Sequence, residues 1–169
     1  MSEDTSTRKI VMGLGNTLNK DEGLGVHAVQ ALEAYLNENF PGKLSSEIEF
    51  LDGGALGLNL LPWVEESSHL VVLDSMVSRF SVPGQVMELA KDEIPLYRNI
   101  KMSDHQITFQ EVLGLAKFRG KFPENLHLVG AQPVDMSIGY GISPEIEAVM
   151  PEIFKRVVRV LKEWDLLSE

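Results

Sequence analysis

Residues 10–26 read Ile10-Val-Met-Gly-Leu-Gly-Asn-Thr-Leu-Asn-Lys-Asp-Glu-Gly-Leu-Gly-Val26, and they predict a strand, a polar loop and the start of a helix. The apolar run 10–12 is typical of a short buried strand, and Gly13 and Gly15 allow a tight turn after it. Turn and capping side chains precede the helical pattern: Asn16, Asn19 and Asp21. Such a loop lies at the carboxyl end of a strand, where α/β proteins usually bind ligands.

The two glycines also suggest a dinucleotide-binding turn, but the residues around them do not support it. That fingerprint needs G-x-G-x-x-G with the helix starting at once, whereas Leu18 occupies the third glycine position and residues 19–22 still intervene. Asp21 and Glu22 would also stand where the pyrophosphate has to bind. These carboxylates either complement the helix dipole or, for Glu22, offer oxygen to a metal ion.

The composition limits the class of protein. The 169 residues fit one domain, residues 1–169, in which we expect residues 1–8 to be flexible. A net charge of -10 argues against nucleic acid as a partner. With no cysteine, any metal site must use oxygen and imidazole ligands. The N-terminus does not resemble a signal peptide and no apolar run is long enough to span a membrane, so we expect a cytoplasmic monomer with no membrane contact.

Apolar runs alternate with helical patterns along the chain. They predict an α/β three-layer sandwich with a mostly parallel, twisted sheet and one antiparallel edge strand. The strand near Gln85 follows the turn at Pro83 and Gly84 with no helix before it, so we expect a hairpin and antiparallel pairing there. The strands expected to be parallel begin near four residues: Lys9, Glu47, His69 and Leu126.

Three longer helices are expected between these strands. Apolar residues at spacings of three and four predict the first at about 25–37, and a second should pass through residues 112–118. Ser143 is a good capping residue and is followed by proline, so the last helix should start there and run to about Trp164. Pro151 is expected to kink that helix or split it.

Acidic residues follow two of the predicted strands. Asp52 precedes Gly53 and Gly54 after the strand at 48–51, and Asp74 ends the continuous apolar run that begins at His69. Because the carboxyl ends of parallel strands meet at one edge of a sheet, both aspartates should lie near the opening loop.

His105 is the histidine best placed for chemistry, because it lies between a polar loop and a predicted helix. The others fall within predicted strands, His69 and His127, or at an exposed position of the first helix, His27. His105, Glu22 and one aspartate would make a ligand set for a divalent first-row metal. Spacing alone leaves Asp52 and Asp74 as alternatives for that aspartate. No G-x-S-x-G elbow, H-E-x-x-H helix or P-loop occurs in the sequence.

Four blocks of the sequence, in order, resemble the hydrogenase maturation endopeptidases. They are G-L-G-N-T-L-N-K-D-E-G-L-G at 13–25, D-G-G-A-L-G at 52–57, L-D-S at 73–75 and S-D-H-Q at 103–106. Members of that family are nickel-checking proteases that trim the C-terminal tail of the [NiFe] hydrogenase large subunit. The resemblance implies an endopeptidase with a compact α/β sandwich, whose partner is the large-subunit precursor.

The resemblance also implies the site. In the family, nickel is bound by an acidic residue of the opening loop, an aspartate after the third strand and a histidine before the next helix, which correspond here to Glu22, Asp74 and His105. Asp52 falls in the D-G-G block instead. Nickel is expected to arrive with the substrate, and another divalent metal could occupy the same site. Ala55 stands where many relatives have threonine, so this chain has no hydroxyl there.

Other functions remain as alternatives at this stage. One is a zinc hydrolase that holds its own ion in the same three residues, and the other is a non-catalytic α/β module that binds a small ligand. The catalytic residue is not assigned, because neither spacing nor resemblance identifies the group that activates the attacking water.

Overall fold

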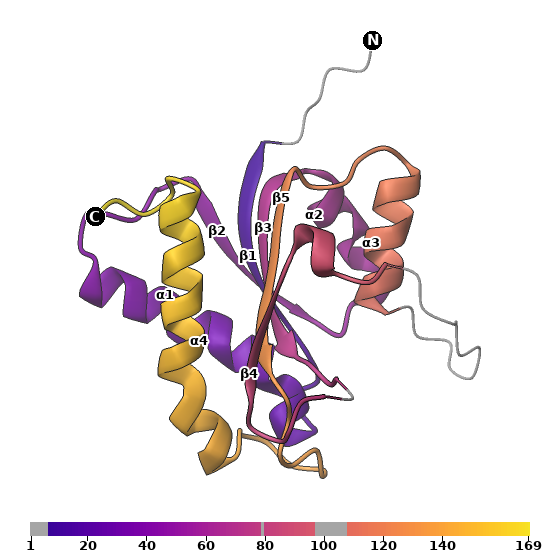
Figure 1. Cartoon of the computed structure of the whole chain (residues 1–169), viewed down its shortest axis with the longest axis vertical. Helices are drawn as coiled ribbons and strands as arrows, with labels where there is room; N and C mark the ends of the chain where they lie inside the picture. The colour runs from indigo at the N-terminus through magenta and orange to yellow at the C-terminus, as the bar shows by residue number, and fades with distance from the viewer. Residues whose placement is uncertain (1–6, 79, 97–107) are drawn as a thin grey trace.

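A computed structural model describes residues 7–78, 80–96 and 108–169, which form a five-stranded sheet between two layers of helices (Figure 1). The strands are β1 (Arg8–Leu14), β2 (Ile48–Gly54), β3 (Ser67–Ser75), β4 (Val86–Ala90) and β5 (Asn125–Ala131). Their order is β2-β1-β3-β5-β4, with β4 antiparallel to β5 and all other pairs parallel. This confirms the predicted three-layer architecture and its antiparallel edge strand.

The pairing of β4 differs from the expected hairpin. β4 follows β3 in the chain but pairs with β5, which lies between them. The reason is burial: the apolar runs of β3 and β5 occupy interior positions covered on both faces, whereas the half-buried β4 suits the edge. The hairpin prediction was therefore wrong, although the antiparallel direction was right.

Helices cover both faces of the sheet, as Figure 1 shows. α1 (Leu24–Asn39) and α4 (Pro144–Glu163) lie on one face, and α2 (Leu61–Glu65) and α3 (Phe109–Phe118) lie on the other. Short 3-10 turns occupy Lys20–Gly23, Gly57–Leu60 and Lys91–Glu93. Within the described ranges no helix has both the length and the apolar character needed to cross a bilayer.

α4 is one helix, although Pro151 lies inside it. Ser143 caps it as predicted, since its Oγ accepts a hydrogen bond from the amide of Ile146, and Pro144 takes the first helical position. Pro151 is exposed, while the apolar side chains of α4 pack on the sheet and hold the helix together across the proline. The expected split therefore does not occur.

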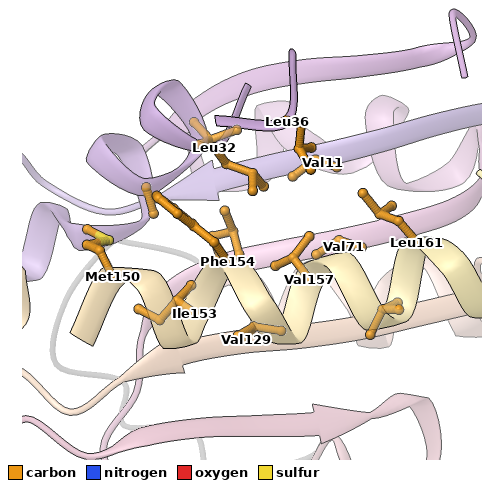
Figure 2. Packing of buried hydrophobic residues seen from close by; sticks show 14 of the residues in the cluster. Val11, Leu32, Leu36, Val71, Val129, Met150, Ile153, Phe154, Val157 and Leu161 are labelled. Atoms are coloured by element: carbon orange, nitrogen blue, oxygen red, sulfur yellow. The ribbon is translucent and has the colours of Figure 1, made fainter. Parts of the chain in front are cut away.

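Each face of the sheet has its own apolar core. Figure 2 shows Phe154 and Val157 of α4 packed near Val71 and Val129 of the sheet. Gly25 brings the start of α1 very close to the strands, because an added Cβ there would lie 2.0 Å from the Leu73 carbonyl oxygen. This close approach sets the loop before α1 over the carboxyl ends of β1 and β3.

The N-terminal end of the described chain is ordered by ion pairs. Arg8 begins β1, and its guanidinium contacts Glu49 at 2.5 Å and Glu66 at 2.8 Å. Arg8 also lies over the Trp63 ring, 4.2 Å from its centroid. Arg8 is therefore part of the sheet, so the prediction that residues 1–8 are flexible was wrong for this residue. Residues 1–6 lie outside the described range.

Candidate active site

The sheet register brings the predicted strand ends together. Gly13 pairs with Asp52 of β2 on one side and with Leu73 of β3 on the other, so Asp74 follows directly at the same edge. The amide of Gly15 donates a hydrogen bond to the Gly54 carbonyl oxygen at 2.9 Å. The loops after β1 and β2 are thus fastened to each other beside the end of β3.

A cavity of about 490 Å³ opens at this edge. Glu22 and Asp74 both line it, together with Asn16, Ala55 and Phe109, the first residue of α3. Asp52 does not line this cavity: its side chain is exposed, and its Oδ1 accepts a hydrogen bond from the Gly54 amide at 2.9 Å. The structure therefore separates the two aspartates that spacing left as alternatives, and it places Asp74 with Glu22.

The electrostatics of the cavity are unusual. Burial raises the pKa of Asp74 to about 7, and the nearby charge of Glu22 adds to the rise. The amide of Ser75 donates to Asp74 Oδ1 at 2.8 Å and opposes this rise. A buried carboxylate with a raised pKa beside a second acidic side chain in an open cavity is typical of functional sites and suits a bound cation.

The third predicted ligand, His105, lies outside the described residues. In the described part of the chain, no three His, Asp or Glu side chains come together in a way that could hold a metal ion. Glu22 and Asp74, the other two predicted ligands, both line the cavity, and α3 begins at the cavity with Phe109 shortly after position 105. The three-residue ligand set therefore stays a prediction.

Gly15 allows the opening loop to reach this arrangement. Its φ is +132°, in the region that favours glycine, and an added Cβ would lie 2.0 Å from the carbonyl oxygen of Glu22. Asn16 stiffens the same loop, since its Oδ1 accepts from the Leu18 amide and its Nδ2 donates to Asn19 Oδ1, both at 3.0 Å. Both motif residues thus shape the wall of the cavity.

Asp21 has a role that sequence reasoning missed. Its carboxylate is fully buried and accepts hydrogen bonds from the amides of Val134, Asp135 and Ser143 at 2.7–2.9 Å, and from the Ser143 hydroxyl at 2.8 Å. Burial by itself would raise the pKa of Asp21, but these hydrogen bonds outweigh burial and lower it. Asp21 therefore fastens the loop before α4 to the opening loop, and no local signal in the sequence identifies a partner so distant.

The other three histidines lie away from the cavity lining. His127 bonds Glu88 at 2.6 Å, and the ring of His69 bonds the Ser68 hydroxyl at 2.8 Å. His27 was expected to be exposed, but it is half-buried because it packs on the Tyr140 ring, with the two centroids 5.1 Å apart. Its Nε2 is buried and has no hydrogen-bond partner among the described residues.

Comparisons with known proteins point to one family. A family model described as hydrogenase maturation protease matches residues 26–160. The chain is 36% identical over 157 residues to the hydrogenase 2 maturation protease of Escherichia coli K12, with 92% of both chains covered. It is 40% identical over 160 residues to the hydrogenase expression/formation protein HupD of Rhizobium leguminosarum, covering 93% of this chain and 75% of HupD.

The similarity extends to solved structures. The hydrogenase maturating endopeptidase HybD from E. coli superposes with a TM-score of 0.79 at 35% identity, over 94% of each chain. A solution structure of an endopeptidase from E. coli gives a TM-score of 0.81 at 34% identity, over 95% of this chain and 96% of that one. The likeness therefore covers nearly the whole chain, in sequence and in fold.

Proposed function

Because this chain belongs to the hydrogenase maturation protease family and is therefore an endopeptidase, we propose that it removes the C-terminal tail of a nickel-loaded [NiFe] hydrogenase large-subunit precursor. Family membership sets aside the non-catalytic ligand-binding module. The observation that carries the finer proposal is the meeting of Glu22 and Asp74 in one open cavity at the carboxyl edge of the sheet.

In the proposed reaction the substrate brings the metal. Glu22, Asp74 and His105 complete the coordination of the substrate's nickel, and this contact holds the neighbouring peptide bond in place for hydrolysis. The role of the three side chains is recognition and orientation. A precursor without nickel would lack the metal that these side chains bind, and it would keep its tail. Cleavage therefore follows nickel insertion, and it occurs once because the tail is then gone.

The test compares tail removal from nickel-loaded and nickel-free precursor, followed by intact mass. Wild type should cleave only the nickel-loaded form. Glu22→Gln and His105→Ala should each slow cleavage by at least about tenfold, because loss of a residue that only supports a metal ligand already costs about 10- to 100-fold. Asp52→Asn is the matched control, because it removes an exposed carboxylate from the neighbouring strand end and should cleave like wild type. Thermal unfolding of each variant shows whether slower cleavage comes from weaker binding of the substrate's nickel or from unfolding of the enzyme.

Two results would contradict the proposal. Equal cleavage of nickel-free and nickel-loaded precursor by wild type would eliminate nickel recognition, and full activity of His105→Ala would remove that residue from the site. Metal analysis of the purified protein tests the zinc hydrolase, which requires one tightly held ion per chain before any substrate is added.

A further inference from the structure

Exposed apolar side chains are concentrated at one edge of the molecule. Of the twelve large apolar residues that are exposed within the described ranges, only Leu115 and Phe118 lie elsewhere, both on α3. The other ten belong to the segments that follow β1, β2, β3 and β5, and two of them, Leu56 and Leu58, line the active-site cavity. Exposed apolar surface gathered in this way marks an interaction site more often than chance exposure does.

Four of these ten lie on two loops that are hydrogen-bonded to each other, and we call them the apolar rim: Leu18, Met136, Ile138 and Tyr140. Their exposed fractions are 66%, 52%, 90% and 75%. Leu18 lies in the opening loop, and the other three lie in the β5–α4 loop, which the isolated bridge between Asn19 and Gly139 holds against it. Four large apolar side chains therefore face water on two loops that are joined to each other.

The rim is rigid, although it is built from loops. Gly139 donates to the Leu18 carbonyl at 2.8 Å and accepts from the Lys20 amide at 3.0 Å, and Asn19 Nδ2 donates to the Met136 carbonyl at 3.2 Å. The buried carboxylate of Asp21 secures the same loop further along. A surface held in this way loses little conformational entropy when a partner covers it.

The four rim side chains carry no charge, in a protein of net charge -10. Among the charged residues of this junction, Lys20 and Asp135 pair with each other at 3.1 Å, and the carboxylate of Asp21 is buried and hydrogen-bonded. Leu18 lies in the opening loop between Asn16 and Glu22, which both line the cavity, so the rim and the active site share this loop. A partner would therefore be held by apolar contact next to the cavity.

From this arrangement we propose that the apolar rim is the docking surface for the folded body of the substrate protein, a role that rests on the proposed function. A short peptide would fill the cavity and leave the rim in water, whereas a folded precursor that places its tail in the cavity must cover the adjoining surface. The enzyme thus selects its substrate by two features, the folded surface that covers the rim and the metal that the precursor carries.

The test is steady-state cleavage of nickel-loaded precursor by Ile138→Ser and Phe118→Ser. These side chains are matched in exposure, at 90% and 87%, but Phe118 is the last residue of α3, at the other end of that helix from Phe109, which lines the cavity. Ile138→Ser should raise KM at least about tenfold with kcat unchanged, and Met136→Ser/Ile138→Ser should raise it further. Phe118→Ser should match wild type, and all variants should unfold at the wild-type temperature.

Each result decides a different point. If wild type does not cleave the precursor, the proposed function fails and the inference falls with it. If wild type cleaves and Ile138→Ser has an unchanged KM, the inference is overturned while the function stands. If sedimentation shows a wild-type dimer that Ile138→Ser converts to monomer, the rim binds a second copy of this chain, which also overturns the inference.

Discussion

Asp21 and Glu22 are neighbours in sequence, yet their carboxylates have different surroundings. Asp21 is buried and accepts four hydrogen bonds, whereas Glu22 lines the open cavity. A carboxylate whose oxygens are already satisfied by amides and a hydroxyl is a poor ligand for an incoming cation. The two neighbours therefore differ in role: Asp21 holds two loops together, and Glu22 lines the cavity where a cation can reach it.

Asp74 should reduce the stability of the metal-free protein as the pH rises. Its folded pKa, about 7, is above the ordinary value of 3.8, so the folded state holds a proton that the unfolded state releases. The contribution of Asp74 to stability is complete below about pH 4 and is lost as the pH rises to about 7. Asp74→Asn, which does not titrate, should be more stable than wild type by about 2–4 kcal/mol at pH 8 and nearly equal at pH 4.

Urea unfolding in the presence of a chelator measures this difference at both pH values. Asp52→Asn is the control, and its effect should stay within about 0.5 kcal/mol at either pH because the side chain is exposed. A stability gain for Asp74→Asn that is the same at pH 4 and pH 8 would show that ionisation is not its cause. The stabilised variant should nevertheless lose cleavage, since the amide is a weaker ligand than the carboxylate.

At the scale of elements, one carboxylate links the side chains of the edge strand β4, strand β5 and helix α4, in addition to the backbone pairing of β4 with β5. Glu88 bonds His127 of β5 at 2.6 Å and receives two hydrogen bonds from Arg159 of α4, with Arg156 at 3.7 Å. The hydrogen bonds from Arg159 are the largest cause that lowers the pKa of Glu88 to about 2, and His127 adds to it. Glu88 thus connects the edge strand, its neighbouring strand and the covering helix.

Glu88→Gln should remove this link while preserving the size of the side chain. Because the folded pKa is depressed from 4.5 to about 2, the stabilisation is present above about pH 5 and is lost as the pH falls toward 2. Arg159 is half exposed, so solvent reduces the effect, and we expect a loss of about 2 kcal/mol at pH 7 that shrinks steadily below pH 5. Chemical unfolding across this pH range measures it.

The control for this link is Glu152→Gln, which breaks only an exposed i,i+4 pair with Arg156. That change should cost less than about 0.5 kcal/mol at every pH. If Glu88→Gln and Glu152→Gln lower the free energy of unfolding equally at pH 7, the contacts of Glu88 with His127 and Arg159 contribute no more than a surface ion pair.

At the scale of the whole molecule, the active-site cavity and the contact between residues 166–168 and the segment before β2 lie at opposite edges of the sheet. The cavity and the apolar rim occupy the carboxyl edge, whereas the chain closes on itself at the amino edge. There Leu167 pairs with Leu44 just before β2, and Ser45 donates to the Leu166 carbonyl at 2.9 Å. Leu166 and Leu167 are buried in the core on the α1–α4 face of the sheet.

Leu167→Ala should therefore destabilise the protein without changing its catalysis. Loss of a buried leucine that is 2% exposed costs about 2–4 kcal/mol, and each kcal/mol lowers Tm by about 3 °C in a domain of this size. Calorimetry measures the shift, and cleavage assays well below Tm should give wild-type kcat and KM. A change in KM at such a temperature would show that the two edges are coupled.

The sequence by itself determined most of the fold and part of the site. Continuous apolar runs and helical spacing identified the five strands, the directions of their pairing and the longer helices, because burial imposes those patterns locally. The same reasoning placed Asp52 and Asp74 at one edge, since parallel strands end together. The resemblance, carried by short local blocks, indicated Glu22, Asp74 and His105 as one ligand set, of which Glu22 and Asp74 line the same cavity.

Only the tertiary structure decided the remaining features. The place of β5 between β3 and β4, the burial of Asp21 by a loop more than a hundred residues away and the half-buried setting of His27 all depend on contacts between distant segments. The apolar rim belongs to this group, because its residues come from two loops that no period or motif connects. Local pattern reports what a residue prefers, whereas the packing of distant elements determines which neighbours it meets.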